Sequence, residues 1–187
     1  MIPDLAERPV AVLDACVLYP TVVRALLLAV ADEGLYVPLW SARLLEEWAR
    51  AAARRGPLEA AQARGEIALA RAAFPGAERP ETPGIAARLW LPDADDVHVL
   101  ALAVSASADL IVTWNAKDFP RGTLAEEGVA RCDPDAFLMA LWLRDGPAVE
   151  RAAERVRAEA ERLDAAPHAV RPLLKKARLP RLAKALG

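Results

Sequence analysis

Short apolar runs recur along the first two thirds of the chain, separated by polar or amphipathic stretches. Runs of four to eight residues that are rich in Val, Ile, Leu and aromatic side chains are typical of buried strands. Pro38 interrupts one of them, which favours an edge strand or a strand end there. The runs that we predict as strands span residues 9–13 (PVAVL), 35–39 (LYVPL), 85–91 (IAARLWL) and 110–113 (LIVT).

The stretches between these runs repeat apolar residues at helical spacing. Ser41 is placed to cap one helix, which Gly56 and Pro57 end. Residues 74–84 contain three prolines and two glycines, so we predict a loop there. The predicted helices span residues 21–31, 41–55, 58–73, 97–107 and 135–143.

This order of elements, βαβααβαβα, indicates an α/β fold with a central parallel sheet and helices on both faces. The length of 187 residues fits one domain, or one domain with a small appendage, and 55% apolar residues suffice for a core. No apolar run is long enough to span a membrane. The first residues, MIPDLAERPVAV, do not have the basic and apolar regions of a signal peptide. We therefore expect a cytoplasmic protein without a membrane partner.

The charge is divided unevenly along the chain. Residues 1–143 contain 13 Lys and Arg against 20 Asp and Glu, a net charge of −7, whereas residues 144–187 contain 11 against 6, a net charge of +5. Residues 148–163 predict a charged helix, and residues 173–186 predict one or two short basic helices around Pro180. We therefore divide the chain into a body, residues 1–143, and a basic helical C-terminal extension, residues 144–187.

The extension has two open roles, which are contact with a polyanion and simple solvation of a charged helical face. We favour a mixed arrangement in which apolar side chains dock on the body and the cations line the path to its cleft. The predicted apolar anchors are Val156, Leu163, Leu173, Leu174, Leu182 and Leu186.

Acidic residues follow or face the ends of the predicted strands. Asp14 comes directly after the first strand, Asp96 opens the helix at 97–107, and Asp118 lies in the loop after the last strand. Because an open α/β sheet gathers functional groups beyond the carboxyl ends of its strands, these acids are expected to face one cleft. Carboxylates gathered in this way repel each other unless protons or a cation hold them, and oxygen ligands favour Mg²⁺ or Mn²⁺. Each acid alone is more often a helix cap or a turn residue.

The two cysteines, Cys16 and Cys132, and the two histidines, His98 and His168, show no zinc-ligand spacing. We predict two buried thiols and no disulfide framework. His98 follows Asp96 on the same predicted helix, and we interpret it as a packing or supporting residue rather than a ligand.

Four segments together carry a resemblance: VLDACVL, SARLLEEWAR, DADDVHVLALAV and IVTWNAKDFP. Over roughly residues 9–140 they are similar to the PIN-domain ribonucleases, and most of all to the VapC-type toxins of toxin–antitoxin pairs. The last two segments are the specific part. The resemblance implies a three-layer α/β/α sandwich that binds Mg²⁺ or Mn²⁺ and cuts RNA, and some VapC-type proteins also have a helical extension.

The resemblance implies roles for single residues. Asp14, Glu47, Asp96 and Asp118 match the catalytic acids, and Asp14, Asp96 and Asp118 match the metal ligands. Glu47 is preferred to its neighbour Glu46 because the pattern places the acid six residues after Ser41. Thr113, Asn115 and Asp95 would support these acids. Asn115 stands where many PIN domains have Asp, which puts tight binding of a second metal in doubt. The cations expected to bind RNA are Arg50, Arg54, Lys175 and Lys176.

The partners that the resemblance implies are an RNA substrate and a cognate small antitoxin protein, and a homodimer stays open. One alternative is a catalytically silent PIN-like protein that only binds RNA or a partner. Another is a phosphatase of the haloacid dehalogenase type, which needs a second acid where Cys16 stands. That phosphatase also needs its Asp pair after the Thr motif, whereas Asp95 and Asp96 precede Thr113.

Overall fold

A parallel five-stranded sheet lies at the centre of the computed structural model, which describes residues 5–187. The strand order is β3-β2-β1-β4-β5, and every neighbouring pair is parallel. Parallel strands need crossover connections, and helices supply most of them here. The strands are β1 (Val10–Leu13), β2 (Val37–Ser41), β3 (Glu78–Arg79), β4 (Leu110–Val112) and β5 (Ala130–Cys132).

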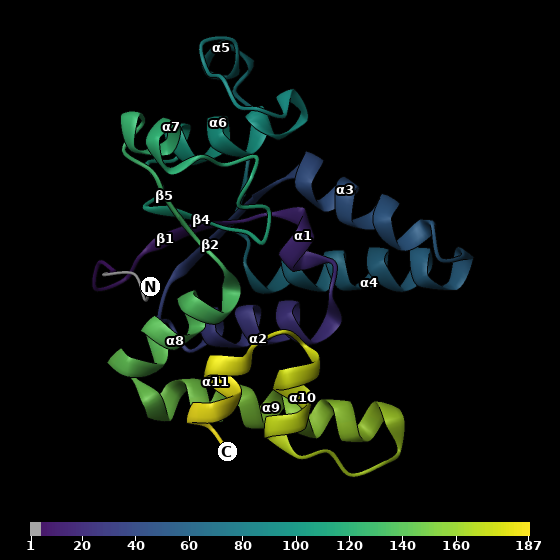
Figure 1. Ribbon diagram of the computed structural model, residues 1–187. Helices are drawn as coiled ribbons and strands as arrows, with labels where there is room; N and C mark the ends of the chain where they lie inside the picture. The colour runs from purple at the N-terminus through teal and green to yellow at the C-terminus, as the bar shows by residue number, and fades with distance from the viewer. Residues whose placement is uncertain (1–4) are drawn as a thin grey trace.

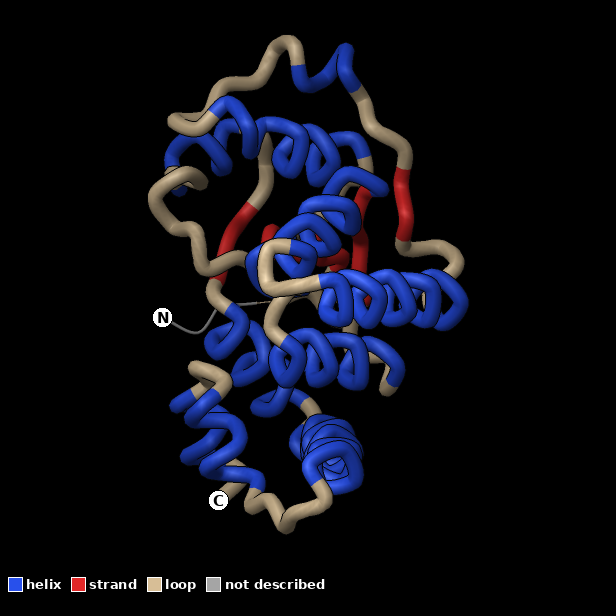
Figure 2. The backbone as a smooth tube through the Cα atoms, turned by 90° about the vertical axis from the view of Figure 1, so that its right-hand side faces the viewer, coloured by secondary structure: helices blue, strands red, loops and turns tan. Residues whose placement is uncertain are grey.

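Helices cover both faces of the sheet, which confirms the predicted α/β/α sandwich. Figures 1 and 2 show α6 and α7 above the strands, α2 and α8 below them, and the last three helices as a further group beneath. The helices of the body are α1 (Ala15–Leu18), α2 (Thr21–Asp32), α3 (Ala42–Ala53), α4 (Pro57–Ala73), α5 (Pro83–Ala86), α6 (Val97–Ser105), α7 (Arg121–Glu126) and α8 (Pro134–Arg144), with a 3₁₀ turn at Ala94–Asp96. The extension forms α9 (Gly146–Asp164), α10 (Val170–Lys176) and α11 (Pro180–Ala185).

The start of α3 follows the sequence signal. The hydroxyl oxygen of Ser41 accepts a hydrogen bond from the backbone N–H of Leu44 at 3.2 Å. This bond satisfies one of the N–H groups that have no partner within a helix. The predicted cap is confirmed, and it marks the start of the helix that carries Glu46 and Glu47.

The prediction of a strand at residues 85–91 is wrong. Pro83 and Gly84 open the short helix α5, and the carbonyl of Thr82 accepts the N–H groups of Ile85 and Ala86. Trp90, which contributed to the apolar pattern, is 67% exposed. The strand in this part of the chain is β3, inside the segment that we predicted as a loop, and its two residues are charged. The sequence analysis also missed α1, α7 and β5.

Pro38 is the second residue of β2, so of the two expectations the strand end is confirmed, whereas the edge strand is wrong because β2 pairs with both β1 and β3. The N–H of Val37 donates to the carbonyl of Pro9 in the direction of β1, and the N–H of Trp40 donates to Ala77 on the other side. By alternation, the nitrogen of Pro38 faces the β3 side. Since β3 pairs only with Trp40 and Ser41, no ladder hydrogen bond is lost at Pro38.

The extension packs on the body through apolar side chains. Helix α9 contacts α2 and α8, and α11 contacts α8. Of the predicted anchors, Val156, Leu174 and Leu182 are buried and Leu173 and Leu186 are partly buried. Leu163 is 61% exposed, so the prediction is wrong for this residue. Leu179, which we did not predict, is fully buried. Within residues 5–187, no helix is both long and apolar enough to cross a bilayer.

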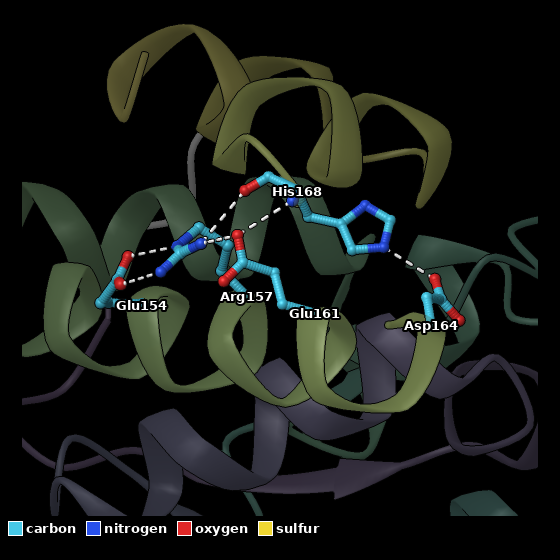
Figure 3. A network of polar contacts seen from close by, with 5 residues as sticks. All are labelled: Glu154, Arg157, Glu161, Asp164 and His168. Carbon is cyan, nitrogen blue, oxygen red and sulfur yellow. Dashed lines mark hydrogen bonds and ion pairs between the residues drawn. The ribbon is translucent and has the colours of Figure 1, made fainter. Parts of the chain in front are cut away.

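Polar contacts on α9 hold the connection to α10 (Figure 3). Arg157 forms ion pairs with Glu154 and Glu161, and it donates a hydrogen bond to the carbonyl of His168 at 3.2 Å. The N–H of His168 donates to Glu161 at 2.9 Å, and the imidazole contacts Asp164. A part of the charged face of α9 therefore orders the loop after this helix.

Candidate metal centre

The first acid of the site lies where two neighbouring parallel strands end. Asp14 follows β1 and Thr113 follows β4, and the N–H of Asp14 donates to the carbonyl of Val112 at 3.2 Å. The Asp14 side chain is buried, with 6% of the residue exposed. Its Oδ2 accepts a hydrogen bond from the hydroxyl of Thr113 at 2.6 Å. Two residues that lie 99 positions apart therefore meet through strand pairing, and the hydroxyl fixes the orientation of the carboxylate.

Cys16 also contacts this carboxylate, which the sequence analysis did not anticipate. Its Sγ donates to Oδ2 of Asp14 at 3.1 Å, lies 3.4 Å from the Thr113 hydroxyl, and accepts the N–H of Trp114 at 3.4 Å. Burial, and then the charge of Asp14, raise the pKa of this thiol to about 12. It therefore stays protonated and acts as a donor. Both cysteines are free, and the prediction of two buried thiols is confirmed for Cys132 but wrong for Cys16, which is only partly buried. Its position two residues after a strand-end acid was the available signal.

Three further carboxylates gather beside Asp14. Asp93, Asp96 and Asp118 each place an oxygen within 4.8 Å of the other two. Asp96 stands at the start of α6 and Asp118 in the loop after β4, whereas Asp93 caps the 3₁₀ turn by accepting the N–H of Asp95 at 2.9 Å. We did not select Asp93 from the sequence, although it lies one 3₁₀ turn before Asp96. Asp95, which we expected to support the acids, is exposed and is not part of this group.

Asp96 has the most perturbed carboxylate of the group. Partial burial, and then the charges of Asp14, Asp93 and Asp118, raise its pKa to about 6. The side-chain amide of Asn115 donates to Oδ2 of Asp96 at 3.0 Å, and the Asn115 N–H donates to the Thr113 hydroxyl. Asn115 is thus a neutral donor that orients the Asp96 carboxylate without adding a charge.

The structure distinguishes Glu47 from Glu46. An oxygen of Glu47 lies 3.0 Å from Nε2 of His98 and 3.1 Å from Nε of Arg43. Partial burial opposes ionisation of Glu47, but the contacts with His98 and Arg43 outweigh it and lower its pKa. The His98 side chain is 8% exposed, and its ring contacts Glu47 without being aligned for a hydrogen bond. Glu47 therefore contacts α6 through His98 and lies outside the tight group of three carboxylates.

Glu46 points toward another helix. Its oxygens lie 3.4 Å from Arg64 of α4 and 3.5 Å from Arg50 of its own helix. Both glutamates still line one open groove between α3 and the acidic turn, together with Arg43, Arg50, Glu81, Asp95 and Asp96. The structure thus places Glu47, and not Glu46, toward the helix that Asp96 opens.

The four cations expected to bind RNA lie in different places. The Arg50 side chain is 72% exposed and lines the groove with Glu47 and Asp96. Arg54 is exposed at the end of α3. Lys175 and Lys176 are exposed at the end of α10, and Lys176 lines a separate groove against α2. Of these four, only Arg50 shares a groove with the acids.

The donors in this group fit a hard divalent cation. The carboxylates of Asp93, Asp96 and Asp118 offer oxygen atoms, and the side chains that hydrogen-bond to Asp14 and Asp96 are the neutral groups of Thr113, Cys16 and Asn115. Neutral donors orient the acids but do not cancel their charge. A cation such as Mg²⁺ or Mn²⁺ would offset the repulsion that raises the pKa of Asp96.

Comparison with known proteins agrees with this geometry. The family model described as the PIN domain matches residues 10–117, more than half of the chain. The match runs from β1 through Asp14, Glu47 and Asp96 to the loop after β4. No curated protein and no solved structure matches the chain. The extent of the match and the sandwich fold together show that the chain belongs to the PIN domain family.

Proposed function

We propose that this protein is a metal-dependent endoribonuclease that cleaves RNA phosphodiester bonds. PIN domains are typically nucleases that depend on Mg²⁺ or Mn²⁺, and an acidic group that could bind such an ion is present. The observation that carries the proposal is the gathering of Asp93, Asp96 and Asp118 within 4.8 Å, beside the buried Asp14. This crowding is unfavourable in isolation, so it is expected where a cation is bound.

The contacts of each residue suggest its role in the proposed reaction. Asp93, Asp96 and Asp118 would hold Mg²⁺ or Mn²⁺, and Asp14 would complete the negative field around the ion. A bound divalent ion offsets the charge of the phosphodiester and lowers the pKa of a coordinated water. Asp96 or Asp118 would help to position the coordinated water or to accept its proton. Thr113, Cys16 and Asn115 hold the acids in place through the bonds described above.

The number of metal ions that the site could hold depends on its carboxylates, and Asp93 is one that the sequence comparison did not include. The Asn at position 115 removes a charge that many PIN domains have, which argued against tight binding of a second ion. Asp93 adds a carboxylate that the motif comparison did not include. Glu47 stays a proposed site residue whose position depends on His98 and Arg43.

Cleavage of RNA by the purified protein tests the proposal. Cleavage should require Mg²⁺ or Mn²⁺ and should stop when EDTA is added. Asp14→Asn and Asp96→Asn should lower its rate by about a hundredfold to a thousandfold, whereas Asp135→Asn, the same change at a buried aspartate outside the acidic group, should leave it within about twofold of the wild type. Equal rates in the wild type, Asp14→Asn and Asp96→Asn would exclude the proposed site. RNA binding without cleavage would favour the catalytically silent alternative.

We further propose that the protein is the toxin of a type II toxin–antitoxin pair, on the basis of the VapC-type resemblance. A small antitoxin would block the acidic groove, and a basic side chain reaching the acids would form charge-assisted hydrogen bonds and compete with the metal. Expression of the wild type should arrest growth, Asp96→Asn should not, and co-expression of a small protein encoded next to it should relieve the arrest. RNA cleavage without arrest would indicate a housekeeping nuclease instead.

A further inference from the structure

A second cavity, of about 380 Å³, opens beside Thr113 between α7, β5 and the loop after β4. Its wall includes Thr113, Trp114, Arg121, Leu124, Val129 and Arg131, and we call it the Trp114 pocket. Leu124 and Val129 are buried and Trp114 is partly buried, so the wall is largely apolar. The pocket shares Thr113, whose hydroxyl donates to Asp14, with the metal centre, and none of the four acids lines it.

Two guanidinium groups stand at this pocket without an acidic partner. Arg121 comes from α7 and Arg131 from β5, and neither forms a salt bridge within residues 5–187. Partial burial, and then the charge of Arg121, lower the pKa of Arg131, so the two groups are close enough to repel each other. Asp133 also lines the pocket, but one of its oxygens accepts the N–H of Ala136 at 2.8 Å. Two guanidinium groups against one carboxylate leave the pocket with an excess of positive charge.

The C-terminal extension brings a third guanidinium, that of Arg178, to the ring of Trp114, although this residue does not line the pocket itself. Arg178 lies over the ring of Trp114, with 4.7 Å between its central carbon and the ring centroid. Its φ is +63°, a left-handed conformation at the end of α10 that favours glycine. The bond from the N–H of Leu179 to the carbonyl of Leu174 closes this helix end. In Figure 1 the turn between α10 and α11 is the part of these two helices nearest to the sheet.

We propose that the Trp114 pocket is a subsite for one nucleotide of the RNA, with the base against Trp114 and the apolar wall and the adjoining phosphates on Arg121, Arg131 and Arg178. Aromatic side chains that stack on bases, with cations along the backbone, are how proteins bind single-stranded RNA. The excess positive charge favours this polyanion over a peptide strand added to the free edge of β5. The inference rests on the proposed function, and it names the part of the RNA path that lies beside the metal centre.

The test compares RNA binding by the wild type and by Arg121→Gln/Arg178→Gly. Both changed side chains are exposed, and glycine suits the left-handed backbone at position 178, so the variant is expected to fold. Binding of a short labelled single-stranded RNA is measured by fluorescence anisotropy in EDTA, where metal-dependent turnover stops. The variant should bind about tenfold more weakly, and the slope of log K against log salt should fall by about 1.4, roughly 0.7 for each lost phosphate contact. Its Mn²⁺ affinity should equal that of the wild type.

The matched control removes two arginines from α9, with Arg151→Gln/Arg162→Gln. Both side chains are more than 60% exposed, and Figure 1 shows α9 and α7 at opposite ends of the molecule. This control should bind RNA like the wild type, and the wild type should bind an abasic strand of equal length more weakly than RNA with bases.

The subsite would be overturned by wild-type affinity and salt slope in Arg121→Gln/Arg178→Gly, by an equal loss in the α9 control, or by equal affinity for abasic RNA. If Arg121→Gln/Arg178→Gly bound RNA like the wild type but no longer bound a co-expressed protein partner, the pocket would be a protein-docking site. That result would also overturn the nucleotide subsite. These failures differ from failure of the proposed function. In that case the wild type binds Mn²⁺ but neither binds nor cleaves RNA, and the subsite falls with the nuclease assignment.

Discussion

Two aspartates of this protein are almost equally buried but lie in opposite surroundings. Asp135, at 5% exposure, accepts backbone N–H groups from Arg181 and Leu182 at 3.0 Å each, one on each oxygen. Asp14, at 6% exposure, accepts the Thr113 hydroxyl and the Cys16 thiol on the same oxygen, and its charge raises the pKa of Asp96. The two residues have similar burial, and they differ in the groups that surround their carboxylates.

The same contrast holds for the two regions that contain these residues. Where the extension meets the body, opposite charges pair, as between Arg151 and Glu33 at 2.6 Å, or carboxylates cap helices. At the ends of β1 and β4, like charges face each other and the neighbouring donors are neutral. The first arrangement is complete as it stands and stabilises the fold. The second gathers like charges that protons or a cation would offset, and we therefore interpret it as the functional region.

The largest expected effect separates the two aspartates by activity. Asp14→Asn should lower the rate of RNA cleavage on the order of a hundredfold to a thousandfold, because a metal centre contributes several kcal/mol and about 1.4 kcal/mol is tenfold in rate. Asp135→Asn keeps one acceptor oxygen for α11 and lies outside the acidic group, so its cleavage rate should stay within about twofold of the wild type. Rates are measured under single-turnover conditions with saturating Mg²⁺. A similar loss in both variants would mean that the contrast between the regions is not functional.

The second prediction concerns the apolar contact of the extension. Leu179 is fully buried and Leu163 is 61% exposed. Leu179→Ala should lower the free energy of unfolding by about 3 kcal/mol, since it leaves a cavity, whereas Leu163→Ala should change it by less than about 0.5 kcal/mol. Urea unfolding followed by circular dichroism measures both. An equal effect would show that the extension docks differently.

The third prediction removes the cap of α11. Asp135→Ala leaves the N–H groups of Arg181 and Leu182 without their acceptors and should cost about 2 kcal/mol of the free energy of unfolding. Asp135→Asn should cost less, because one oxygen can still accept. Hydrogen exchange should show faster exchange in α11 than in β1 for the Ala variant. Unchanged protection of α11 would argue against the capping role.

Sequence patterns were sufficient for the inner part of the sheet but not for its edges. Strands β1 and β4 are covered on both faces, so they read as continuous apolar runs and were predicted. Strand β3 is Glu78–Arg79, and β5 has Arg131 at its centre. These strands are defined by pairing with a neighbour, which local periodicity does not report.

The site shows the same limit. Asp14 and Asp96 could be selected because strand ends and helix starts meet at one edge of a parallel sheet. Asp93 and Cys16 were missed because their positions depend on a 3₁₀ turn and on the one-turn helix α1. Leu163 fits the apolar stripe of α9 but is exposed near the end of that helix. Helical spacing predicts which face of a helix is apolar, but it does not predict how far along the helix the packed neighbouring helix extends.

The smallest predicted effect is a dependence of stability on pH that arises from the acidic region. The pKa of Asp96 is about 6 in the folded protein, against about 3.9 for an unperturbed Asp. Between these values a folded-state Asp96 binds more protons than an unfolded one, so the contribution of Asp96 to the free energy of unfolding of the metal-free protein should rise as the pH falls from 7 to 5. Because Asp96 is only partly buried, solvent screening reduces the expected gain to about 1 kcal/mol. Urea unfolding in EDTA at pH 5 and pH 7 measures this gain in the free energy of unfolding. The difference between the two pH values should be smaller in Asp96→Asn. It should also be smaller when Mn²⁺ replaces EDTA at pH 7. If Asp96→Asn had the same pH dependence as the wild type, repulsion at Asp96 would not be the source, and the difference between the two regions would rest on activity alone.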